Sequence, residues 1–144
     1  METTARILLT LTTLGYSAIT IMADLNKTHA SNPLWTPHAR FHVVWQVLSY
    51  SGIGLVALYL IWVPGAMAVE RLYLAAALSV AVYAGFFGAV FSRPAYGGGL
   101  YDRNGYPSFP APIGPKTWLW DVNVTVFAIV STILVAAIAA VAAS

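Results

Sequence analysis

Two histidines four residues apart are the clearest candidates for chemistry in this sequence. They are His38 and His42, in the segment from Trp35 to Gln46. Residues at this spacing lie on one face of an α-helix, one turn apart. Thr36 can cap such a helix, and Pro37 suits its first position. A neutral imidazole coordinates haem iron or another transition metal, and it also transfers protons near neutral pH, so the spacing leaves these uses open.

Other polar residues recur at helical spacing within apolar segments. The three series are Thr13, Tyr16, Thr20 and Asp24; then Trp45, Gln46, Ser49 and Gly52, which continue from the histidine pair; and finally Asp121, Thr125 and Thr132. Polar groups inside a bilayer are costly and usually functional, so we expect these series to converge on a pocket near one membrane face. His38, Asp24 and Asp121 are then candidates for proton transfer in that pocket.

The composition indicates that lipid surrounds most of the chain. Of the 144 residues, 59% are hydrophobic and 8% are charged, against about 25% charged in a typical soluble domain. The mean hydropathy is +0.74. The chain has no cysteine, which excludes thiolate nucleophiles and zinc-thiolate or iron-sulfur sites. A net charge of +2 is too small to indicate a nucleic-acid partner.

Four apolar segments are long enough to cross a bilayer. They cover about 7–23, 37–63, 71–91 and 118–142, and we expect Pro94 to stop the third. The sequence therefore predicts an all-α integral membrane protein with a single domain, folded as an up-down bundle of four transmembrane helices. The connections 24–36 and 92–117 are long and polar, whereas 64–70 is short, so both long loops should lie on one face of the bundle.

Basic residues are more frequent on the side of the long loops. That side has Lys27, Arg40, Arg93, Arg103 and Lys116, whereas the side of the termini has Arg6 and Arg71. The positive-inside rule then predicts cytoplasmic long loops in a bacterial-type inner membrane.

The segment Ala39-Arg40-Phe41-His42 resembles the styrene oxide isomerase family, which has an Ala-Arg-x-His string after its first polar loop. The order of Gly85-Phe86, Phe91-Ser92-x-Pro94 and Gly99-Leu100 is also similar. Members of that family are small four-span membrane enzymes that rearrange aryl epoxides to aldehydes with haem b as a Lewis acid. The chain departs from the family at Phe87, where the family has tyrosine, and at Leu48-Ser49, where the family has asparagine nearby.

The resemblance implies that His42 is the axial ligand of haem b. We predict that Arg40, Trp45, Ser49 and Arg93 complete the haem site, and that Tyr83, the nearest tyrosine to the departure at Phe87, acts with His38, Asp24 and Asp121 in catalysis. The implied function is isomerisation of lipophilic epoxides to carbonyl products, on substrates that arrive from membrane lipid.

Two other classes of function remain open at this stage. One is a haem-free isomerase or binder of sterol-like or terpenoid ligands that uses histidine and aspartate. The other is an accessory subunit of a larger membrane complex. Four thin spans bury little surface alone, and a haem needs more wall than one small bundle offers, so we also expect a homo-oligomer, for example a trimer.

Overall fold

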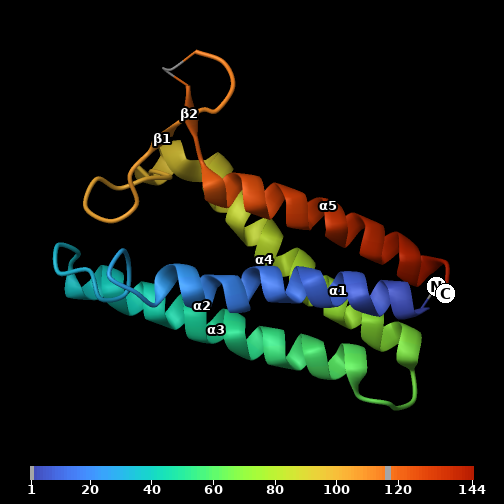
Figure 1. The fold of residues 1–144 in the computed structure, drawn as a ribbon. Coiled ribbons are helices and arrows are strands. Elements are labelled where there is room, and N and C mark those ends of the chain that lie inside the picture. The colour runs from blue at the N-terminus through green and yellow to red at the C-terminus, as the bar shows by residue number, and fades with distance from the viewer. Residues whose placement is uncertain (1, 116–117) are drawn as a thin grey trace.

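The computed structural model describes residues 2–115 and 118–144, so Lys116 lies outside the described residues. The chain forms an all-α bundle of α1 (Glu2–Tyr16), α2 (Ala18–Asp24), α3 (Pro37–Trp62), α4 (Ala68–Tyr96) and α5 (Val122–Ala142) (Figure 1). Helices α1 and α2 together form one span, so the described residues contain four helical segments long and apolar enough to cross a membrane. The predicted fold class is confirmed.

The first span begins earlier than predicted, and Ser17 separates its two helices α1 and α2. It starts at Glu2, whose carboxylate pairs with Arg6 one turn later at 2.6 Å. Where the two helices meet, the Ser17 hydroxyl donates to the Thr13 carbonyl, and the Thr20 hydroxyl donates to the Tyr16 and Ser17 carbonyls. Such bonds from hydroxyls back to helix carbonyls satisfy polar groups within the bilayer and bend the helix.

The second span begins where the sequence predicts. The Thr36 hydroxyl accepts a hydrogen bond from the Ala39 amide, and Pro37 is the first helical residue. The cap fixes the direction in which α3 enters the membrane, and with it the positions of the two histidines in its first turns.

The third span corrects the prediction that Pro94 stops its helix. Helix α4 continues to Tyr96 and ends at Gly97, which has a positive φ of 67°. Proline lacks the amide hydrogen that would bond the Val90 carbonyl. The Arg93 side chain supplies the missing donor, because its Nε donates to that carbonyl at 2.7 Å.

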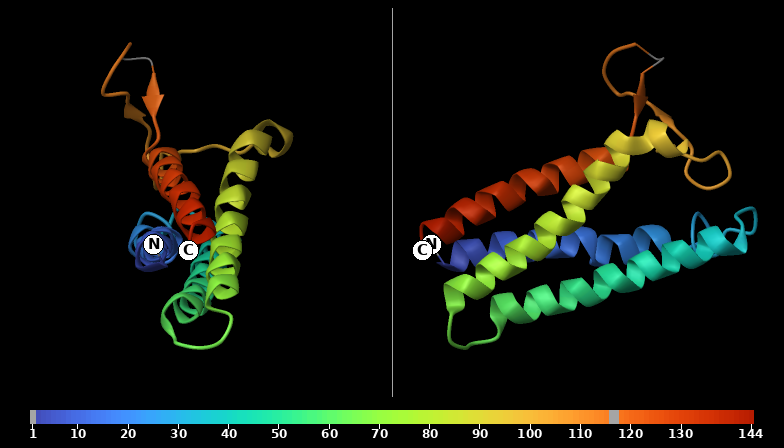
Figure 2. Two further views of the ribbon diagram at one scale, coloured as in Figure 1. Left: turned by 90° about the vertical axis from the view of Figure 1, so that its right-hand side faces the viewer. Right: turned by 180° about the vertical axis from the view of Figure 1, so that it is seen from behind.

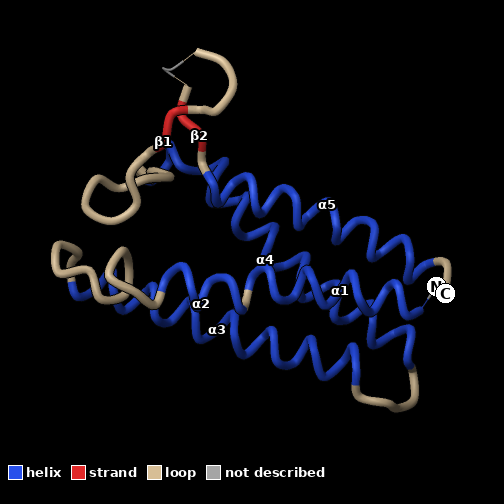
Figure 3. The backbone as a smooth tube through the Cα atoms, viewed as in Figure 1, coloured by secondary structure: helices blue, strands red, loops and turns tan. Residues whose placement is uncertain are grey.

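The fourth span starts at Val122 rather than near residue 118. Asp121 is its cap and accepts a hydrogen bond from the Val124 amide. The preceding residues form β2 (Leu119–Trp120), which pairs antiparallel with β1 (Phe109–Pro110). Figure 3 shows this short ribbon in the second long loop, close to the start of α5. Apolar aromatic residues at 118–120 matched a helix pattern, but backbone pairing with the loop places them outside the bundle.

Both long loops lie at one end of the bundle, and the two termini lie together at the other (Figures 1 and 2). The helices pack closely near the termini, whereas α4 and α5 diverge from α2 and α3 toward the loops. The fully buried core is correspondingly concentrated near the termini, in residues that include Ala5, Leu9, Ile61, Leu72, Ala137 and Val141. The end of the bundle near the loops is therefore packed less tightly, and it has room for a binding site.

Gly15 permits the closest approach between α1 and its neighbours. A Cβ at this position would lie 2.8 Å from the Tyr83 hydroxyl and 2.9 Å from a Val130 methyl group. We expect Gly15→Ala to destabilise the bundle by about 1–3 kcal/mol through overpacking. Thermal unfolding in detergent measures this loss. Gly88→Ala is the matched control, because no atom lies within 4 Å of its added Cβ, and an equal effect of both variants would contradict the packing argument.

Candidate functional site

The histidine pair lies on the outer surface of α3. His38 and His42 are both exposed, and their Nε2 atoms are 3.0 Å apart, so one ring donates a hydrogen bond to the other. The rings meet edge to face with centroids 4.5 Å apart. The prediction that they share one face of a helix is confirmed, but that face points out of the bundle rather than into its core.

Two exposed aromatic rings lie beside His42. Phe41 is 60% exposed and Trp45 is 57% exposed. Their ring centroids both lie 5.7 Å from the centroid of His42. Together these residues form an outer histidine face, defined here as His38, Phe41, His42 and Trp45. Its two imidazoles have few protein partners, which is costly for polar groups at a membrane surface unless something covers them.

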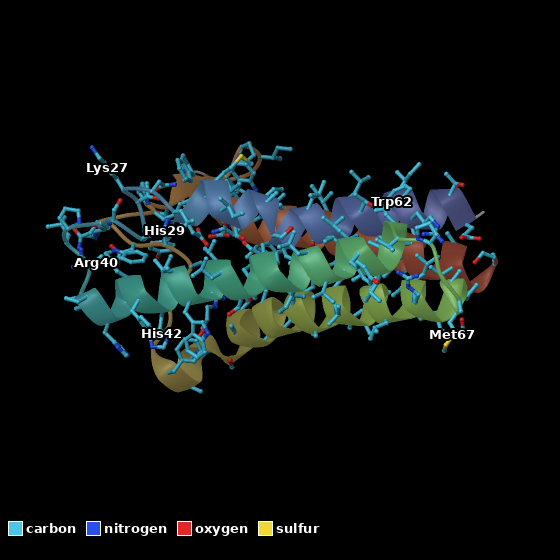
Figure 4. The ribbon with its side chains drawn as sticks, turned by 90° about the horizontal axis from the view of Figure 1, so that it is seen from below. Lys27, His29, Arg40, His42, Trp62 and Met67 are labelled. Atoms are coloured by element: carbon cyan, nitrogen blue, oxygen red, sulfur yellow. The ribbon has the colours of Figure 1, made fainter. Side chains whose placement is uncertain are left out.

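Only some of the residues predicted to bind the cofactor lie near the outer histidine face. Arg40 and His42 project from different sides of α3 (Figure 4). Arg40 lines a surface pocket with Ala30 and Val44. Arg93 is on α4, where it bonds the Val90 carbonyl. The structure therefore does not bring the two arginines to His42, although the exposed Trp45 lies beside it and Ser49 is half-buried one turn beyond.

A cavity of about 300 Å³ lies inside the divergent end of the bundle. Its lining comes from α2, α3, α4, α5 and the second long loop. The polar residues include Asp24, Gln46, Tyr106 and Asn123, and the aromatic walls include Phe86 and Phe127. Gln46 is one helical turn from His42 on α3, so this inner cavity and the outer histidine face are neighbours. The first polar series of the sequence, which ends at Asp24, does reach this cavity.

Asp24 faces His29 across a gap. The His29 Nδ1 atom lies 3.9 Å from an Asp24 carboxylate oxygen and 2.7 Å from the Thr28 hydroxyl. The Thr28 hydroxyl also lies 2.6 Å from Oδ1 of Asn26, which can only accept. The single Thr28 proton is thus used, so His29 Nδ1 must carry hydrogen and donate to Thr28. Nε2 of a neutral His29 is then an acceptor.

The two long loops pack against each other above the cavity. Asn32, which is 1% exposed, donates to the Asn104 carbonyl at 2.6 Å. A Cβ at Gly105 would collide with the Thr28 carbonyl, so glycine allows this close approach. A second pocket of about 310 Å³ lies at the junction, and it shares Tyr106 and Asn123 with the inner cavity.

Two donors in this region lack partners among the described residues. They are Nε1 of Trp35 and the hydroxyl of Tyr106, both of which are buried. Burial and the negative charge of Asp121 raise the pKa of the Tyr106 phenol, so it remains protonated at neutral pH. Buried donors without partners are uncommon in folded proteins and are consistent with a bound molecule or water.

The remaining predicted catalytic residues occupy structural positions. Tyr83 is 3% exposed, and its hydroxyl donates to the Thr12 carbonyl at 2.6 Å. Its ring packs against Tyr16 and Phe127 in the core. Asp121 caps α5. Neither residue lies with His38, and Asp24 faces the cavity instead.

Sequence reasoning did not identify Asn123 and Tyr106 as site residues. Asn123 is a polar residue at the start of the most apolar span, which is a usable signal in a membrane helix. It was missed because the third polar series was built on Thr125 and Thr132. In the structure Thr132 is exposed and bonds its own helix at Ala128. Tyr106 is on a loop with no periodic pattern, so its position depends on the contact between the loops.

No family model, curated protein or solved structure matched this chain.

Proposed function

We propose that the protein is a membrane-embedded isomerase that converts lipophilic aryl epoxides to carbonyl products, with haem b held by His42. The observation that carries the proposal is the outer histidine face: an exposed imidazole next to the exposed rings of Phe41 and Trp45, near the start of a membrane helix. The Ala39–His42 string agrees with the resemblance to styrene oxide isomerases.

The residues present fit an axial haem ligand. Nε2 of His42 is engaged only by Nε2 of His38 among the described residues, and both side chains are exposed, so rotation of His38 frees the ligating atom. When bound, haem b would supply a ferric Lewis acid that polarises the C–O bond of the epoxide. The reaction is a rearrangement: one C–O bond breaks and a hydride moves to the neighbouring carbon, so no co-reactant is consumed.

The protein surface around His42 suits a reaction that must avoid water. Phe41 and Trp45, whose ring centroids are 6.2 Å apart, offer apolar ring surface beside the imidazole. The benzylic cation forms when the epoxide ring opens, and the hydride shift then removes it. Exclusion of water during this interval prevents capture of the cation as a diol. A substrate dissolved in the bilayer can reach this outward surface without passing through the aqueous loops.

The proposed enzyme is a homo-oligomer. The outer histidine face and the residues that follow it on α3, such as Leu48 and Tyr59, are largely exposed in the single chain. A second copy would cover the open side of a haem on His42. The excess of basic residues in the long loops supports cytoplasmic loops in a bacterial-type inner membrane.

The test is a visible spectrum of the purified protein, followed by product analysis. We expect a Soret band, and we expect protein in lipid vesicles to convert styrene oxide to phenylacetaldehyde. Vesicles without protein are the control for uncatalysed opening. A protein that gains no Soret band when haem is added, or that gives only the diol, contradicts the proposal.

A further inference from the structure

The inner cavity presents an uncompensated carboxylate. Among its lining residues, Asp24 is the only one with a carboxyl group. Its side chain is 20% exposed, and Nδ1 of His29 lies 3.9 Å from one of its oxygens. The hydrogen on Nδ1 of His29 is directed to the Thr28 hydroxyl. Within the described residues, no side chain donates a hydrogen bond to this carboxylate, which is an expensive state for a charge at membrane depth.

Three other polar groups in the lining are also free to bind a ligand. The side-chain amides of Gln46 and Asn123 form no hydrogen bond within the described part of the chain, and the Tyr106 hydroxyl is buried without a partner. Amides both donate and accept, so they can orient a polar head group beside Asp24. The cavity therefore has one strong acceptor and several adaptable groups.

Another part of the lining is aromatic and apolar. Phe86 and Phe127 stack with their ring centroids 4.0 Å apart and an interplanar angle of 28°. Val126 adds an aliphatic surface from α5. Aromatic faces attract cations as well as apolar groups, so these walls suit a molecule with an apolar body and a positive head.

We propose that the inner cavity binds a small lipophilic amine, whose ammonium group pairs with Asp24 and whose apolar body packs against Phe86 and Phe127. The volume of about 300 Å³ is at the lower end for ligand pockets, which limits the ligand to a small molecule. The site requires no haem and goes beyond the isomerase activity proposed above. The junction pocket, which shares Tyr106 and Asn123 with the inner cavity, lies next to it on the side of the loops.

Calorimetric titration of the purified protein in lipid nanodiscs tests this site. The probes are 2-phenylethylamine and its neutral counterpart 2-phenylethanol. We expect the amine to bind more tightly, and Asp24→Asn to weaken the amine by about 10- to 100-fold with little effect on the alcohol. Glu70→Gln is the matched control, because it removes one carboxylate at the far end of the molecule, and it should leave both affinities unchanged.

A second variant leaves Asp24 in place and fills the inner cavity. Val126→Phe should fill the cavity from α5 and weaken both probes while Asp24 is intact. If the amine binds equally to wild type and Asp24→Asn, or binds Val126→Phe normally, the proposal is overturned. Tighter binding of the alcohol than of the amine to the wild type would also overturn it, since the cavity would then select a neutral ligand. A missing Soret band in a protein that still binds the amine would reject the isomerase proposal alone.

Discussion

His42→Ala is expected to lose nearly all haem, whereas His38→Ala is expected to retain it. Nε2 of His42 is the proposed iron ligand, and in the structure the same atom contacts Nε2 of His38 at 3.0 Å. Removal of His38 therefore takes away a competing hydrogen bond without removing the ligand. The measurement is the ratio of Soret absorbance to protein concentration after purification with added haem.

His29→Ala is the matched control for this pair. It removes the third histidine of the chain, which lines the pocket at the loop junction rather than the outer histidine face. Its haem content should equal that of the wild type. Addition of imidazole to His42→Gly should restore part of the Soret band, because the small molecule replaces the missing ring. Loss of haem in His38→Ala with retention in His42→Ala would assign the ligand to His38 instead.

Asn32→Ala is expected to open the junction between the two long loops. The Asn32 amide donates to the carbonyls of Thr28 and Asn104, and its oxygen accepts from the Leu34 amide. Each buried group left without a partner costs about 1–3 kcal/mol. We expect tryptic cleavage after the exposed Arg103 to accelerate by about tenfold or more, because proteolysis follows the population of the open state. Mass spectrometry of the fragments over time measures the rate.

Asn104→Ala is the matched control, because it distinguishes loss of the Asn32 hydrogen bond from a general loosening of the second long loop. Asn32 bonds the main-chain carbonyl of residue 104, and truncation of the Asn104 side chain leaves that acceptor in place. Its cleavage rate should stay near that of the wild type. If the two variants are cleaved at equal rates, the Asn32 bond does not hold the loops together. Asn32→Ala should leave the helices themselves folded, since its partners all lie in the loops.

Much of the fold follows from local features of the sequence. Long apolar segments must form helices in lipid, because only internal hydrogen bonds satisfy the backbone there. The cap at Thr36 and Pro37 specified where α3 begins, and the loop lengths specified which ends lie together. Pro94 was misjudged because its effect depends on a neighbouring donor, Arg93, that replaces the missing hydrogen bond. The start of α5 depended on pairing between β1 and β2, which is a contact between distant residues.

The sequence by itself determined the residue types available for a site, and the tertiary structure decided which of them meet. Spacing placed His38 and His42 on one face of α3, since helical periodicity is local, but only the packing of α3 turned that face outward. Asp24 was visible as the last member of a polar series. Asn123 and Tyr106, which line the same cavity, come from α5 and a distant loop, so their meeting there depends on how the helices diverge and how the loops close.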